Sequence, residues 1–163
     1  MNDLVNNFNG KIINPRTKFK YEKNNNKLFF YFEAYDSSLI SYSDKDNDEL
    51  WRDDVVEVFL DLGDEFYYEF EVAPNGAVFV ATINNRKITF IENNFFTASS
   101  LIEGNAYKVK MTIDLNKLGN PKEIKFNAFR VEVKENNGPQ ILEALNPTLC
   151  ETFHVREKFI KLV

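Results

Sequence analysis

The chain has 163 residues and a formal net charge of −5. A chain of this length can bury a full core, so residues 1–163 are expected to form a single domain. The acidic balance disfavours nucleic-acid partners, because binding to a phosphate backbone needs a basic patch. Cys150 is the only cysteine, which excludes an intramolecular disulfide.

The N-terminal region lacks the basic residues and the apolar run of about 7 to 15 residues that mark a secretory signal. We therefore expect a cytoplasmic protein, and an extracellular location only if the sequence is trimmed from a longer one. No stretch approaches the ~20 apolar residues that cross a bilayer, so no membrane partner is expected. The oligomeric state stays open.

Strand-like segments separated by short turns make up most of the chain. Its 16 Phe and 7 Tyr, with many Val, Ile and Thr, favour strands over helices. A helical turn is expected only at 114–119, and residues 1–16 are expected to form an edge segment. Strands are expected at 18–22, 27–36, 77–83, 86–91, 95–103, 107–115, 124–133 and 157–163, in addition to a central pair within 50–72. This pattern predicts an all-β fold, an antiparallel two-sheet β-sandwich or barrel with little helix.

Residues 50–72 form the predicted central hairpin, with its turn at Gly63-Asp64. In the second strand of this hairpin, large apolar residues alternate with Glu69 and Glu71, so one face is expected to meet the core and the other water. In the first strand, the face that carries Glu57 also carries Val and Phe side chains. This mixed face suits the floor of a groove.

Residues 124–133 change the phase of their apolar pattern near Ala128-Phe129. A β-bulge at this point would account for the change, and bulges often lie beside binding sites. From the parity of their positions, Asn127 and Arg130 are expected to supply donors to the same groove as Glu57.

Four segments, in chain order, resemble the sequence signatures of one known family. Residues 51–61 read W-R-D-D-V-V-E-V-F-L-D, and residues 67–76 read Y-Y-E-F-E-V-A-P-N-G. Residues 125–130 (K-F-N-A-F-R) and 146–159, with N-P-T followed by F-H-V-R-E-K-F, complete the set. Together they resemble the family 9 carbohydrate-binding modules and their DOMON-like relatives.

The resemblance implies a β-sandwich whose concave face binds the end of a sugar chain, in some members between two tryptophans and with bound calcium in some. Trp51 matches one aromatic wall, and Glu57 matches a carboxylate that accepts hydrogen bonds from sugar hydroxyls. Flat aromatic walls suit the C–H faces of a sugar, and polar side chains suit its hydroxyl rim. The candidate ligand-binding residues are Trp51, Glu57, Glu71, Asn127 and Arg130.

Three positions depart from the family pattern, and one of them is Arg156, which stands where the closing segment has proline and is expected to be more mobile. Leu145 stands where the family has its second tryptophan, and Ile160 stands where the closing segment has glycine. One sugar wall is therefore expected to be missing, and Ile160 is expected to fill space that a ligand would need.

Several side chains have both a structural and a functional interpretation. Trp51 either supports a ligand or plugs the end of the sandwich, and Glu57 either contacts sugar or is tied to Arg130 or to backbone amides. No metal is expected, with the alternating carboxylates of Asp44, Asp46 and Asp48 as weak calcium candidates. Asp53 and Asp54 are expected to accept hydrogen bonds from loop amides, and His154 is expected to make a structural hydrogen bond.

Three functions fit the sequence. The first is a non-catalytic module that binds a glycan end or a small sugar in a concave groove, with no cofactor other than a possible calcium ion. The second is a structural or protein-interaction domain that has lost sugar binding. The third is a carbohydrate-active enzyme that uses a pair of carboxylates, of which Asp53 and Asp54 are the nearest candidates.

Overall fold

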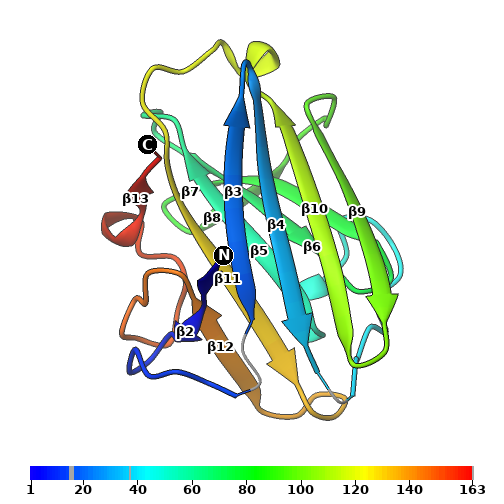
Figure 1. Cartoon of the computed structure of the whole chain (residues 1–163). Helices are drawn as coiled ribbons and strands as arrows, with labels where there is room; N and C mark the ends of the chain where they lie inside the picture. The colour runs from blue at the N-terminus through cyan, green and yellow to red at the C-terminus, as the bar shows by residue number, and fades with distance from the viewer. Residues whose placement is uncertain (15–16, 37, 163) are drawn as a thin grey trace.

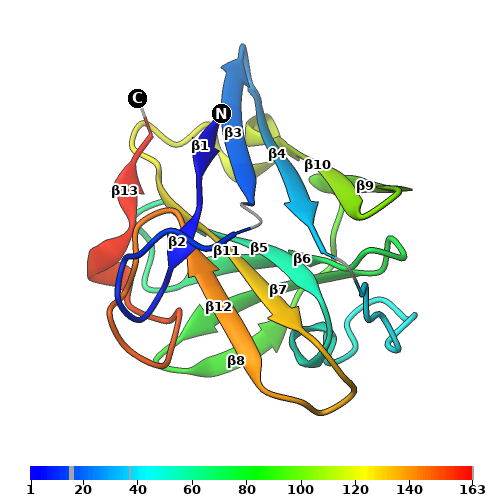
Figure 2. The same cartoon turned by 60° about the horizontal axis from the view of Figure 1, so that its bottom comes forward.

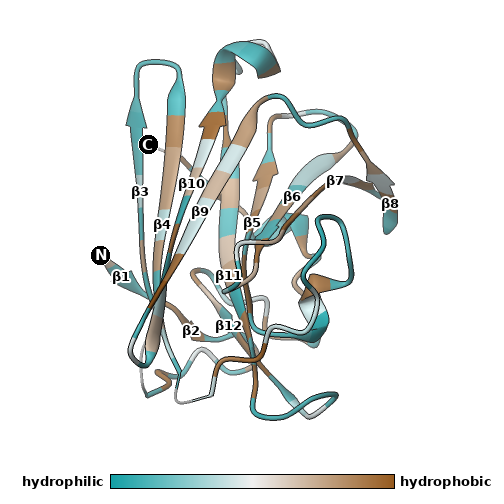
Figure 3. Cartoon of the chain, turned by 90° about the vertical axis from the view of Figure 1, so that its right-hand side faces the viewer, coloured by the Kyte–Doolittle hydropathy of each residue, from teal (hydrophilic) through white to brown (hydrophobic). Residues whose placement is uncertain are grey.

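The computed structural model describes residues 1–14, 17–36 and 38–162. Two antiparallel sheets face each other across an apolar interior, and Figure 3 shows the two layers side by side. The predicted all-β sandwich is therefore confirmed. No helix among the described residues is long and apolar enough to cross a membrane.

The smaller sheet lies at the front of Figure 1. Its strand order is β1 (Asn2–Asp3), β3 (Lys18–Asn24), β4 (Lys27–Tyr35), β10 (Ala106–Asp114) and β9 (Phe96–Glu103). A 3-10 helix, η2 (Leu115–Leu118), ends β10 and confirms the predicted helical turn.

The larger sheet crosses behind the smaller one. Its strand order is β2 (Val5–Asn6), β12 (Gln140–Ala144), β11 (Lys125–Val133), β5 (Val55–Asp61), β6 (Tyr67–Val72), β7 (Val78–Asn84) and β8 (Lys87–Phe90), with β13 (Ile160–Lys161) paired to β11. Strands β5 and β6 form the predicted central hairpin. Because β1 and β2 each lie at a sheet edge, the edge placement of the N-terminal segment is confirmed up to Asn14; residues 15 and 16 lie outside the described part.

The inner face of the larger sheet packs against the smaller sheet. Val56, Val58 and Leu60 of β5 meet a cluster of phenylalanine rings that includes Phe30 and Phe126. These side chains are fully buried, as the alternation in the sequence predicts. The main core therefore lies between the two sheets.

The outer face of the larger sheet carries a second apolar cluster, which includes Phe59 and Phe129. Two long segments cover this face, residues 38–54 and residues 145–159, and they lie on opposite sides of the molecule in Figure 2. The side chains of Ile40, Leu50, Phe153 and Phe159 are the buried contacts of these segments.

Four local predictions need correction. The pairing of β11 with β5 is continuous from Lys125 to Val131, so no bulge is present at Ala128-Phe129. The phase change instead reflects a strand that is buried on both faces. Glu69 and Glu71 are buried under the covering segments and do not face water. Strand β12 was not predicted, and only Ile160–Lys161 of the predicted strand at 157–163 is extended, with the last residue outside the described part.

Candidate functional site

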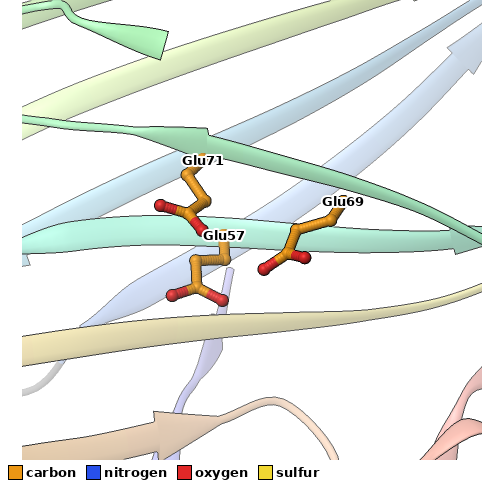
Figure 4. Close-up of side chains that lie close together, drawn as sticks. All are labelled: Glu57, Glu69 and Glu71. Atoms are coloured by element: carbon orange, nitrogen blue, oxygen red, sulfur yellow. The ribbon is translucent and has the colours of Figure 1, made fainter. Parts of the chain in front are cut away.

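Three glutamates lie at the centre of the outer face of the larger sheet. Glu57 on β5 pairs directly with Glu71 on β6, and Glu69 lies two residues from Glu71 on the same face. Figure 4 shows the three side chains grouped together on these two strands. Their exposed fractions are only 2%, 5% and 0% for Glu57, Glu69 and Glu71. The β-strand period of two places all three on one face, and the covering segments bury them.

A cavity of about 340 Å³ opens over this part of the sheet, within the range of roughly 300–1,000 Å³ that is usual for ligand pockets. Glu57 and Glu69 lie in its lining, whereas Glu71 does not. The apolar lining residues are Trp51, Phe79, Ile88, Val131, Leu142 and Phe153, and the remaining polar ones are Gln140, Glu151, Thr152 and His154. No lysine or arginine is among the described residues that line it.

Trp51 lies in the 3-10 helix η1 (Leu50–Arg52), where the buried Leu50 side chain anchors the turn. The indole meets the Phe79 ring edge-on, with 5.6 Å between ring centroids. Gln140 Nε2 donates to the Trp51 carbonyl oxygen at 2.5 Å, which ties η1 to β12. Trp51 is half-buried, so one part of it packs on the second cluster while another part lines the cavity.

Asp53 and Asp54 hold the segment that carries Trp51. The amides of Tyr42 and Ser43 donate to Asp53 Oδ2 at 2.7 and 2.8 Å. The amide of Ile40 donates to Asp54 Oδ2 at 2.6 Å. The prediction that both carboxylates accept from loop amides is confirmed, and these two groups fix one wall of the cavity.

His154 lines this cavity and a second hollow as well. Its ring stacks on Phe59 with 5.0 Å between centroids, and its Nδ1 is 2.7 Å from the Tyr67 hydroxyl. The predicted structural hydrogen bond is therefore confirmed. The second hollow, of about 420 Å³, also contains Arg86 and Arg156 in its lining, so polar surface continues beyond the imidazole.

The three glutamates have strongly perturbed acidities. Burial raises the pKa of Glu57 well above its usual range, and the neighbouring Glu69 raises it further. Burial raises the pKa of Glu69 to about 7. For Glu71, burial acts first and repulsion by Glu57 and Glu69 adds to it, so its pKa is also raised well above the ordinary value. Clusters of perturbed acids beside a cavity are typical of functional sites.

A family model described as "Carbohydrate family 9 binding domain-like" matches residues 2–144. The chain belongs to this family. A protein of Arthroderma benhamiae called "Extracellular protein" is 28% identical over an alignment 174 residues long. The alignment covers 91% of this chain and 78% of that protein.

Solved structures show the same fold. A Bacteroides uniformis protein proposed to bind carbohydrate superposes with a TM-score of 0.81 at 18% identity, over 98% of this chain and 83% of that one. A family 9 carbohydrate-binding module from Caldicellulosiruptor kristjanssonii, in complex with glucose, superposes with a TM-score of 0.64 at 18% identity, over 88% and 72% of the two chains. The same module in complex with cellotriose gives a TM-score of 0.64, over 88% and 71%.

The structure brings together only part of the set of candidate residues that the family 9 resemblance suggested. Trp51 and Glu57 line one cavity, and Glu71 lies beside Glu57 on the neighbouring strand without lining that cavity. Asn127 is on the same face but is fully buried: its Oδ1 accepts from the amides of Ala128 and Asn146, and its Nδ2 donates to the Asn146 carbonyl at 2.8 Å. Asn127 therefore holds the closing segment and does not line the cavity.

Arg130 faces the opposite side of the sheet from Glu57, so the predicted shared groove is wrong for this residue. It pairs with Val56 of β5, on the inner face, and its side chain has no exposed surface. Its Nη2 donates to Asp36 Oδ2 at 3.1 Å, and its Nη1 lies 3.4 Å from Glu143 Oε1. The prediction failed because Asn127 and Arg130 are three residues apart, so they lie on opposite faces of a continuous strand.

One of the departures from the family pattern, Ile160, has a different consequence from the one expected. Leu145 and Ile160 both pack against the core between the sheets, and neither lines the cavity. Ile160 thus fills the sandwich interior and not the ligand space.

The loop carboxylates of Asp44, Asp46 and Asp48 do not come together as a metal site. Asp46 accepts from the Val78 amide at 3.0 Å, and Asp48 accepts from the Glu49 amide at 2.9 Å. Among the described residues, the group of acidic side chains close enough to share an ion is Glu57, Glu69 and Glu71.

Sequence reasoning missed most of the residues that line the cavity, and three of them show why. Glu69 was assigned to a solvent face, and Gln140 and Leu142 lie on the unpredicted strand β12. The two-residue spacing of Glu69 and Glu71 predicts that they share one face of their strand. The pairing of Glu57 with Glu71 in the structure adds Glu57 to that face. The sequence pattern did not predict that residues 38–54 and 145–159 cover this face. These segments make it the floor of a cavity and not a solvent-exposed face.

Proposed function

We propose that this chain is a non-catalytic carbohydrate-binding module that holds a glycan end or a small sugar in the outer-face cavity. The observation that carries the proposal is that Trp51 and Glu57, the two residues matched to the family 9 signature, line the same cavity. An indole wall offers a flat apolar surface to the C–H face of a sugar ring, and carboxylates accept from its hydroxyls. Membership of the carbohydrate-binding family 9 supports the same ligand class.

The size of the ligand is part of the proposal. The second hollow shares His154 with the cavity, so bound sugar units have a path across the imidazole toward Arg86 and Arg156. We expect a ligand of one to a few units, with the terminal unit against Trp51. Glucose and cellotriose, which the Caldicellulosiruptor kristjanssonii module binds, are the first sugars to test.

Calorimetric titration with glucose, cellotriose and a panel of other glycans tests the proposal. Trp51→Ala should lower the affinity for the bound sugar at least tenfold, because the apolar wall is lost. Phe90→Ala is the matched control: Phe90 also meets Phe79 edge-on, with 5.4 Å between centroids, but it is 56% exposed and is not among the lining residues. Unchanged affinity in Trp51→Ala, or equal losses in the two variants, would contradict the proposal.

Asp53 and Asp54, the pair of carboxylates considered for an enzyme, accept hydrogen bonds from backbone amides. These bonds give both side chains a structural role. We expect no turnover of chromogenic glycosides by the wild-type protein. The cytoplasmic location expected from the sequence stays a prediction.

A further inference from the structure

The three glutamates on the outer face are close enough to share one ion. One carboxylate oxygen from each of Glu57, Glu69 and Glu71 lies within 4.8 Å of the other two. Two oxygens on opposite sides of a calcium ion are about 4.6–5.2 Å apart, since Ca–O distances are 2.3–2.6 Å. No pair in the group is therefore too far apart to contact a common ion.

The protein itself does not satisfy these carboxylates. Glu71 is fully buried and faces the group (Figure 4), yet no donor from the described residues reaches either of its carboxylate oxygens. Oε2 of Glu69 is buried and likewise has no partner. Buried polar atoms in folded proteins nearly always have a partner, and uncompensated buried charges are costly. A cation bound at this position would satisfy these oxygens, as would a proton shared between Glu69 and Glu71, whose carboxyl groups interact with each other.

The donor set selects the class of cation. All three side chains offer carboxylate oxygens, and these are the ligands that hard divalent cations prefer. The single histidine and the single cysteine, His154 and Cys150, lie outside the group. We propose that Glu57, Glu69 and Glu71 bind a divalent cation, with Ca²⁺ favoured because three carboxylates offer up to six oxygens to its large coordination shell.

The position of the group connects it to the cavity. Glu57 and Glu69 line the cavity, whereas Glu71 lies behind them. Coordination positions that the glutamates leave open therefore face the cavity, where water or a ligand hydroxyl can fill them. Cation binding as such does not depend on the proposed glycan binding; only this last point does.

Terbium luminescence tests the inference on the whole protein without any sugar. Trp51 is the only tryptophan and lines the same cavity as Glu57 and Glu69, so tryptophan-selective excitation should sensitise Tb³⁺ held by the glutamates. We expect saturable luminescence that added Ca²⁺ displaces, and calorimetry should give tighter binding of Ca²⁺ than of Mg²⁺.

Matched variants locate the site. Glu71→Gln should weaken Tb³⁺ and Ca²⁺ binding at least tenfold, and Glu57→Gln should do the same if Glu71→Gln fails to fold by circular dichroism. Asp46→Asn is the control: it removes an exposed carboxylate from the acidic loop, outside the cavity, and should leave the affinity unchanged.

Two results would overturn the inference: the absence of saturable binding to the folded wild-type protein, or binding that survives Glu71→Gln and is lost in Asp46→Asn. A parallel glycan titration in the presence of a chelator separates the two proposals. Glycan binding without any cation binding removes only the cation site, and cation binding without glycan binding removes only the proposed function.

Discussion

Two clusters of buried carboxylates lie on opposite faces of the same sheet, and they differ in how their charge is balanced. On the inner face, Arg130 donates to Asp36, to the Thr17 hydroxyl and to the Tyr35 carbonyl, with Glu143 3.4 Å away. On the outer face, no ion pair within the described residues involves Glu57, Glu69 or Glu71, and no described lysine or arginine lines their cavity.

This difference in charge balance distinguishes a cluster that holds the fold together from a cluster that is a candidate binding site. The inner cluster supplies its own cation and is sealed between the sheets, so it holds the ends of β4, β11 and β12 together. The outer cluster has no cation of its own and adjoins a cavity, so its balance has to come from protons or from a bound ligand. Burial of charge alone would not have distinguished the two.

The largest expected effect comes from removing the cation of the inner cluster. Arg130→Met should lower the free energy of unfolding by about 3–5 kcal/mol at pH 8, because it leaves the buried Glu143 without its cation and leaves Asp36 with only the half-exposed Lys134 at 3.6 Å. Urea unfolding measures the change. Arg156→Met is the control: Arg156 pairs with Asp61 at 2.6 Å, but its side chain is 34% exposed, so its loss should cost about 1 kcal/mol or less. Equal losses in the two variants would contradict the assignment of Arg130 as the central cation.

The pH dependence of stability gives the next largest effect. Burial raises the pKa of Glu143 to about 7, against the opposing effects of Arg130 and Thr17, while Glu132 raises it further. A carboxyl group with a raised pKa in the folded state contributes stability that is complete below the unfolded value near 4.5 and is lost as the pH rises through about 7. The free energy of unfolding should therefore be lower at pH 8 than at pH 5.

Glu143→Gln should reduce this difference by on the order of 2 kcal/mol, since the group that titrates is gone. Urea unfolding at both pH values measures it, with Glu103→Gln, which removes one partner of an exposed pair with Lys108, as the control. A wild-type protein that becomes more stable between pH 5 and pH 8 would show that the sign is wrong.

The smallest effect has the opposite sign and belongs to the outer cluster. In a chelator at pH 8, Glu71→Gln should raise the free energy of unfolding by about 1 kcal/mol, because it removes a buried charge and supplies an amide donor to the neighbouring carboxylates. Glu151→Gln should change nothing, since Glu151 is exposed. A loss of stability in Glu71→Gln under these conditions would mean that the outer cluster, like the inner one, is balanced within the protein.

Much of the fold was predictable from alternation and turn residues. The hairpin of β5 and β6 follows from apolar residues at every second position with Gly63-Asp64 between them, and the covered strand β4 from its run of large apolar residues. Strand β12 was missed because its five residues, Q-I-L-E-A, carry no alternation that a solvent face would impose.

The site was predictable only in part, for a physical reason. The pairing of Trp51 with Glu57 follows from their spacing and from the family resemblance. The face of Arg130 depends on strand register, and a shift of one residue moves a side chain to the other face of a sheet. The closure of the cavity depends on segments 38–54 and 145–159, whose positions are set by contacts between residues far apart in the sequence.

Nuclear magnetic resonance titration of the labelled protein with a bound glycan tests the central claim most directly, because the single tryptophan gives a single indole N–H signal. The account predicts that this signal and the amide signals of β5, β6 and residues 152–154 shift saturably, while those of β3, β4 and β10 in the smaller sheet stay in place. Saturable shifts confined to the smaller sheet, with the indole signal unmoved, would contradict the assignment of the outer-face cavity as the binding site.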